Sequence, residues 1–99
     1  MRLNTEQVQT IKQVAQQVLG EGARVILFGS RTNDNLRGGD IDLLFETPHQ
    51  LDDRVATTGR LYTHLIRGLG DRKIDIVLKD ASTPEASVMR VARETGVEL

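Results

Sequence analysis

Hydrophobic residues recur at two different spacings along the chain, and these spacings predict helices and strands. From Leu3 to Leu19, apolar residues stand three or four positions apart, which is the spacing of one helix face. Asn4 and Gln7 form the pattern of a capping box at the start of this helix, and Gly20 follows its end. Short apolar runs predict three strands: Arg24 to Phe28, Asp40 to Phe45 and Lys73 to Leu78.

A second helix is predicted between the second and third strands, from Gln50 to Leu69. Thr47 is its expected N-cap, and Pro48 would occupy the first helical position, where the missing N–H of proline does no harm. The apolar stripe that predicts this helix consists of Leu51, Val55, Tyr62, Leu65, Ile66 and Leu69.

A last helix is predicted near the C-terminus. Its cap is expected at Ser82 or Thr83, beside Pro84, and the helix should run to about Thr95. Its expected buried residues are Val88, Val91 and Ala92. The order of elements predicts a single α/β (α+β) domain over residues 1–99, with a small mixed sheet and helices packed on one of its faces.

Composition and charge narrow the class of protein. With 99 residues, of which 38% are hydrophobic, the chain is expected to build one modest core. It contains no cysteine, which excludes disulfides and thiolate metal sites. A net charge of −1 predicts no direct binding to nucleic acid. Because no apolar run matches a membrane span or a secretory signal, we expect a cytoplasmic protein without a membrane anchor.

Aspartates interrupt two of the predicted strands. In DIDLLF, Asp40 and Asp42 alternate with apolar residues and therefore share one face of the strand. In KIDIVL, Asp75 likewise lies on the face opposite the isoleucines. If the two strands are neighbours with their apolar faces against the helices, the three aspartates gather on the open face of the sheet. Clustered carboxylates need a countercharge, and their hard oxygen atoms suit Mg²⁺.

A Gly-Ser pair directly follows the first predicted strand. Gly29 permits a tight turn and a close approach of the backbone to a ligand. Ser30 offers a hydroxyl and an N–H group, and Arg31 is a further candidate for contacting phosphate. If a helix begins here, its first N–H groups form a phosphate site. A phosphate-binding turn and three clustered aspartates together predict a nucleoside triphosphate site.

This arrangement resembles the nucleotidyltransferases of the DNA polymerase beta superfamily. The chain contains the Gly-Ser pair, nine further residues, the Asp-Ile-Asp motif that begins at Asp40, and then Asp75. The short chain looks most like the minimal nucleotidyltransferases of bacteria and archaea. Its spacer is shorter than is usual in that group, and Gly39 stands where a serine often precedes the aspartate pair.

The resemblance implies a role for each of these residues. Gly29 and Ser30 would hold the β- and γ-phosphates. Asp40 and Asp42 would ligate two Mg²⁺ ions, while Asp75 would complete the catalytic metal site and help to deprotonate the acceptor hydroxyl. The implied reaction is attack of that hydroxyl on the α-phosphorus, most simply of ATP, with release of pyrophosphate.

The resemblance also implies a partner. A chain of this length is expected to lack a second domain that reads an acceptor, so another molecule must present it. Minimal nucleotidyltransferases are commonly paired with a helical HEPN protein, an RNase toxin, and act as its antitoxin, in some cases by adenylylating a tyrosine. A homo- or hetero-oligomer is therefore expected. Two alternatives remain: a binding module that neutralises its partner by contact alone, and a nucleotidyltransferase that modifies a small molecule.

Overall fold

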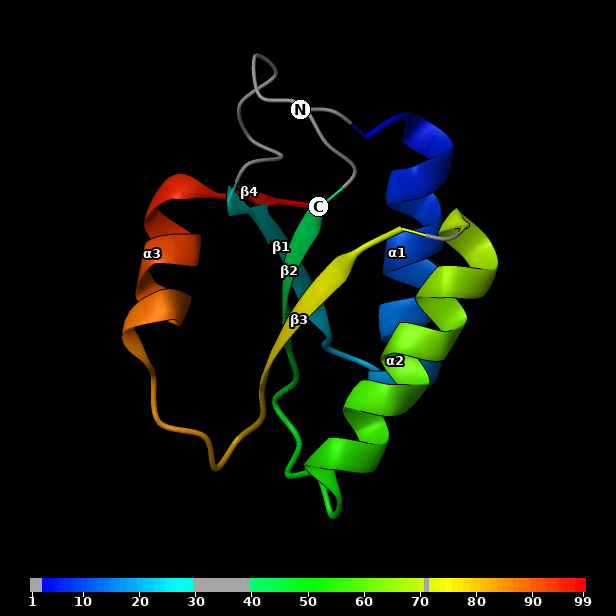
Figure 1. The fold of residues 1–99 in the computed structure, drawn as a ribbon. Helices are drawn as coiled ribbons and strands as arrows, with labels where there is room; N and C mark the ends of the chain where they lie inside the picture. The colour runs from blue at the N-terminus through cyan, green and yellow to red at the C-terminus, as the bar shows by residue number, and fades with distance from the viewer. Residues whose placement is uncertain (1–2, 30–39, 71) are drawn as a thin grey trace.

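The computed structural model describes residues 3–29, 40–70 and 72–99, and these ranges contain three helices and four strands (Figure 1). The elements in chain order are α1 (Thr5–Leu19), β1 (Arg24–Phe28), β2 (Ile41–Glu46), α2 (Arg54–Leu69), β3 (Ile74–Lys79), α3 (Ser87–Thr95) and β4 (Val97–Glu98). The predicted strands are all present, and β2 and β3 each begin and end one residue later than the sequence pattern suggested.

The strands form one mixed sheet in the order β3-β2-β1-β4. β1 pairs antiparallel with β2 and with β4, whereas β2 pairs parallel with β3. The sheet and its helices confirm the expected α+β class with a small mixed sheet. β4 was not predicted, because a strand of two residues, Val97 and Glu98, is too short to show an alternating pattern.

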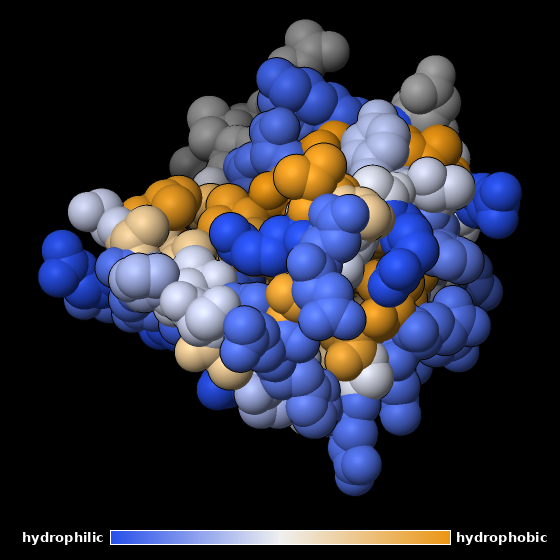
Figure 2. Space-filling model, turned by 90° about the horizontal axis from the view of Figure 1, so that it is seen from below, coloured by the Kyte–Doolittle hydropathy of each residue, from blue (hydrophilic) through white to orange (hydrophobic). Residues whose placement is uncertain are grey.

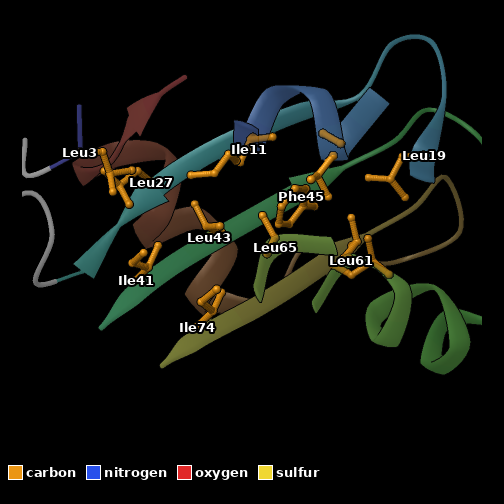
Figure 3. Close-up of a cluster of buried hydrophobic side chains, with 14 residues drawn as sticks. Leu3, Ile11, Leu19, Leu27, Ile41, Leu43, Phe45, Leu61, Leu65 and Ile74 are labelled. Carbon is orange, nitrogen blue, oxygen red and sulfur yellow. The ribbon is translucent and has the colours of Figure 1, made fainter. Parts of the chain in front are cut away.

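α1 and α2 cover one face of the sheet, as the alternation of the strands predicted. Figure 3 shows side chains of β2, such as Ile41 and Phe45, directed into a cluster with Leu61 and Leu65 of α2. The capping box of α1 is confirmed, since the Asn4 side chain accepts a hydrogen bond from the Gln7 backbone N–H and the reverse bond is also present. The contacts between β2 and α2 fix which face of β2 is buried, and therefore which face carries Asp42.

α3 departs from the expectation that the helices pack on one face, because it lies on the opposite side of the sheet (Figure 1). Met89 and Ala92 are its buried residues. Val88 and Val91, which were expected to be buried, are 44% and 51% exposed. An ion pair between Arg93 of α3 and Glu46 of β2 further ties this helix to the sheet.

α2 begins later than predicted, at Arg54 rather than Gln50. Thr47 is not its N-cap: the Thr47 N–H donates to the Lys79 carbonyl at 3.0 Å and extends the pairing of β2 with β3. The cap is Asp53, whose side chain accepts a hydrogen bond from the backbone N–H of Ala56. This start turns Thr57, Leu61 and Leu65 inward, and it leaves two members of the predicted stripe, Val55 and Tyr62, exposed.

In the turn after β3, the polar residues form hydrogen bonds with a buried carboxylate and do not cap α3. Asp80 is 2% exposed and accepts hydrogen bonds from the hydroxyls of Ser82 and Thr83. Its second oxygen accepts from the Leu51 N–H at 2.9 Å, which joins this turn to the segment before α2. Ser82 and Thr83 are therefore occupied, and α3 begins only at Ser87, after Ala86.

We expect Asp80→Asn to destabilise the protein at neutral pH. Hydrogen bonds, first from the Thr83 hydroxyl and then from the Leu51 N–H, hold the pKa of the Asp80 carboxyl well below the ordinary value of 3.8. A lowered pKa stabilises the fold above the ordinary pKa and is lost as the pH falls below it. Thermal unfolding should therefore show a lower melting temperature for Asp80→Asn at pH 7 and a shrinking difference from wild type below pH 3.8.

The control for this measurement is Asp52→Asn, the same change at an exposed residue of the loop before α2. It should leave the melting temperature nearly unchanged at both pH values. An equal effect of the two substitutions would show that the Asp80 hydrogen bonds do not stabilise the turn.

Candidate nucleotidyl-transfer site

Two aspartates lie side by side near the starts of neighbouring strands. In the parallel register of β2 and β3, Asp42 is paired with Asp75. Paired residues of parallel strands point to the same side of the sheet, and such strands lie about 4.8 Å apart. Asp42 is half-buried, and Asp75 is exposed. The fold therefore brings these two carboxyl groups together on the face away from α1 and α2, where the sequence pattern placed them.

The ionisation of Asp42 reflects this crowding. Burial raises the pKa of the Asp42 carboxyl, and so do a hydrogen bond with the Asp75 carboxyl and the negative charges of Asp75 and Asp40. The positive charge of Lys73 acts in the opposite direction. Since the acidic neighbours all disfavour a negative Asp42, this end of the sheet is short of positive charge.

Gly29 lies directly against Asp42. It follows the last residue of β1, Phe28, which pairs with Asp42 in the antiparallel register. Gly29 has a φ of +74°, and a Cβ built there would stand 2.2 Å from Oδ2 of Asp42. A side chain at this position would overlap the carboxylate and would also require a strained backbone. The close contact places Gly29, the first residue of the predicted Gly-Ser motif, beside Asp42 at one end of the sheet.

Of the other predicted site residues, the structure describes only some. Asp40 comes directly before β2 and is exposed, and its charge reaches Asp42, as the raised pKa of Asp42 indicates. Ser30 and Arg31, the predicted phosphate contacts, lie outside the described residues. The catalytic, phosphate-binding and metal-binding roles of all these residues remain predictions.

The described donors fit an ion that takes part of its coordination from other molecules. Within residues 3–29, 40–70 and 72–99, no group of three His, Cys, Asp or Glu side chains is placed to hold a metal ion. Mg²⁺ is commonly bound through one or two carboxylates, with water and substrate phosphates as its remaining ligands. Asp42 and Asp75 offer such a pair of oxygen donors, and a divalent cation bound to them would offset the repulsion that raises the pKa of Asp42.

The aspartate face is not open along its whole length, which sequence reasoning missed. Leu44 and Val77 lie on this face and belong to the cluster around Met89 of α3. A signal was present, because Leu44 and Val77 each stand two positions after an aspartate and therefore share its face. The face changes from acidic to apolar along both strands, and α3 covers the apolar part.

Fold and site together define a small α+β domain in which paired aspartates lie beside Gly29 at one end of a mixed sheet. The family model of the nucleotidyltransferase domain matches residues 8–93, a range that includes both aspartates and Gly29. The chain belongs to this nucleotidyltransferase domain family. Membership supports transfer of a nucleotidyl group as its general activity. A search of curated proteins gives no match to the chain.

Among the described residues, no helix has the length and apolar character that a membrane crossing requires.

Proposed function

We propose that this protein transfers a nucleoside monophosphate, most simply AMP from ATP, to a hydroxyl group in a Mg²⁺-dependent reaction. The observation that carries the proposal is the pairing of Asp42 with Asp75 beside Gly29, in a chain of the nucleotidyltransferase domain family. Paired carboxylates beside a glycine, whose backbone is not covered by a side chain of its own, are suited to a metal-bound triphosphate.

The proposed chemistry is a displacement at phosphorus. A bond forms between the acceptor oxygen and the α-phosphorus, the bond from the α-phosphorus to the bridging oxygen breaks, and pyrophosphate leaves with the electron pair. The acceptor proton passes to the carboxylate of Asp75, which is exposed, and from there to solvent. Bound Mg²⁺, expected as two ions, supplies positive charge that stabilises the attacking and leaving oxygens.

The residues around Asp75 are proposed to bind and orient the nucleotide. Asp40 and Asp42 would share the metal ligation with Asp75, and the contact with Gly29 restricts where the Asp42 carboxylate can lie. Such restriction matters because a preorganised charge need not rearrange when the transition state forms. Gly29 and Ser30, with Arg31 next to them, are the proposed contacts of the β- and γ-phosphates.

The proposed acceptor is a hydroxyl on a HEPN-type helical protein, for which the chain would act as an antitoxin in the cytoplasm. Besides the resemblance, the distribution of apolar residues supports a protein partner. A groove of about 450 Å³ beside β3 is lined by Val55, which is 83% exposed, and by residues of β3 and α3. Figure 2, which looks at the molecule from below the view of Figure 1, shows apolar side chains among hydrophilic ones on this surface.

Neutralisation of the partner by contact alone is the second candidate function. The same apolar groove favours it, because binding through Val55 and its neighbours would need no chemistry. Modification of a small molecule, the remaining alternative, has no structural observation in its favour.

Nucleotide binding provides the first test of the proposed function. ATP with Mg²⁺ should raise the melting temperature, because a ligand that binds only the folded state stabilises it by about 2.7 kcal/mol at a hundred times its Kd. Ser30→Ala should reduce this shift by removing a phosphate contact. ATP with a chelator is the control and should give a much smaller shift.

A negative result has a definite meaning here. If millimolar ATP with Mg²⁺ leaves the melting temperature unchanged, both with and without the partner, then nucleotide transfer is excluded and contact alone becomes the favoured function.

A further inference from the structure

Lys73 stands at the rim of the candidate site. The backbone N–H of Ile41 donates to the Lys73 carbonyl at 3.0 Å, which extends the β2–β3 pairing by one residue. Ile41 is paired with Ile74, and the same register continued by one position would set Lys73 opposite Asp40. Lys73 also precedes Asp75 by two positions, and residues two apart along an extended chain share a face. Its side chain therefore starts from the same face as Asp42 and Asp75.

The Lys73 ammonium is close to the aspartates without being fixed by one of them. Lys73 is exposed, and among the described residues it takes part in no ion pair within 4.0 Å. Its positive charge nevertheless acts on Asp42. By contrast, Lys79 at the other end of β3 donates a hydrogen bond to the Thr83 carbonyl and is committed to the fold.

We propose that Lys73 binds the phosphates of the nucleotide and the pyrophosphate that leaves. This inference rests on the proposed function and adds a phosphate-binding residue to that site. A metal-bound triphosphate brings more negative charge to a place that already holds three aspartates. Lysine is suited to such an anion, because its ammonium is a compact charge on a flexible stem that can turn from the carboxylates to a phosphate.

A role limited to the fold is the competing explanation. In that case Lys73 would serve only to reduce repulsion among Asp40, Asp42 and Asp75, and its removal would change stability but not phosphate binding. The two explanations therefore predict different measurements: a small change in melting temperature for a role in the fold, and weaker binding of phosphates for the proposed role.

The test is isothermal titration calorimetry with MgATP and, separately, with pyrophosphate and Mg²⁺. Lys73→Met should weaken binding of both ligands by about tenfold or more, the usual effect of losing one charge-assisted contact. Lys73→Arg should retain most of the affinity because it keeps the charge. Lys12→Met is the matched control, since Lys12 is an exposed lysine on α1, which covers the opposite face of the sheet.

The outcomes separate this inference from the proposed function. If wild type binds both ligands and Lys73→Met binds them equally well, the role of Lys73 is refuted and the proposed function stands. A lower melting temperature of Lys73→Met with unchanged affinity likewise refutes it in favour of the role in the fold. If wild type binds neither ligand, the proposed function itself fails and the inference fails with it.

Discussion

Asp42→Asn should lower nucleotidyl transfer by about a hundredfold or more, because it removes a charge that is proposed to hold the metal at the reacting phosphate. Asparagine has nearly the same shape and can occupy the space beside Gly29. The substitution therefore changes charge with little change in packing. The measurement is mass spectrometry of the proposed HEPN-type partner protein after incubation with ATP and Mg²⁺. Wild type should add one or more AMP units.

The same substitution should not destabilise the metal-free protein at neutral pH. The raised pKa of Asp42 means that the folded state binds a proton more tightly than the unfolded chain does. Stability is therefore lost as the pH rises from the ordinary pKa of 3.8 through the raised value. Asp42→Asn has no proton to lose in this range. Its melting temperature should match or exceed that of wild type at pH 7 in the presence of a chelator.

Asp52→Asn is the matched control, because Asp52 is an exposed aspartate outside the site. It should transfer AMP at the wild-type rate. The enzymatic proposal would be refuted if wild type neutralised the partner without adding mass and Asp42→Asn neutralised it equally well. That result would establish the contact-only function.

The strands, and with them the aspartate pair, could be predicted because alternation is a local property. Asp42 and Asp75 each alternate with apolar residues, so burial of those residues fixes the face of both aspartates. What alternation cannot supply is the neighbour of each strand. The pairing of β2 with β3 had to be assumed, and the register that sets Asp42 against Asp75 became visible only in the fold.

The starts of α2 and α3 were predicted wrongly because their capping residues have competing partners. Thr47 followed by Pro48 has the pattern of a helix start, but the Thr47 N–H continues the sheet instead. Ser82 and Thr83 donate to the nearby Asp80, a local turn contact that competes with capping of α3, and the Leu51 N–H binds the same carboxylate from a distant segment. At Thr47 a tertiary hydrogen bond prevails over a local preference, whereas at Ser82 and Thr83 one local hydrogen-bonding preference prevails over another.

Gly29→Ala should damage both stability and transfer. The φ of +74° at Gly29 costs an alanine about 1–2 kcal/mol, as at any left-handed position. The added Cβ would also lie 2.2 Å from Oδ2 of Asp42, so either the turn or the carboxylate must move. Overpacking of this kind typically costs about 1–3 kcal/mol more. Because Asp42 is the proposed metal ligand, its displacement should also reduce AMP transfer by an order of magnitude or more.

Gly20→Ala separates the backbone effect from the contact with Asp42. Gly20 has a similar φ of +83°, but a Cβ there meets nothing within 4 Å, so this variant reports the cost of the backbone alone. Urea unfolding should show a greater loss for Gly29→Ala than for Gly20→Ala, and the excess should disappear when Asp42 is also replaced by alanine, which removes the overlapping oxygen. Transfer should survive in Gly20→Ala. If the two glycine variants lose equal stability and equal activity, then Gly29 serves only as a turn residue and does not position Asp42.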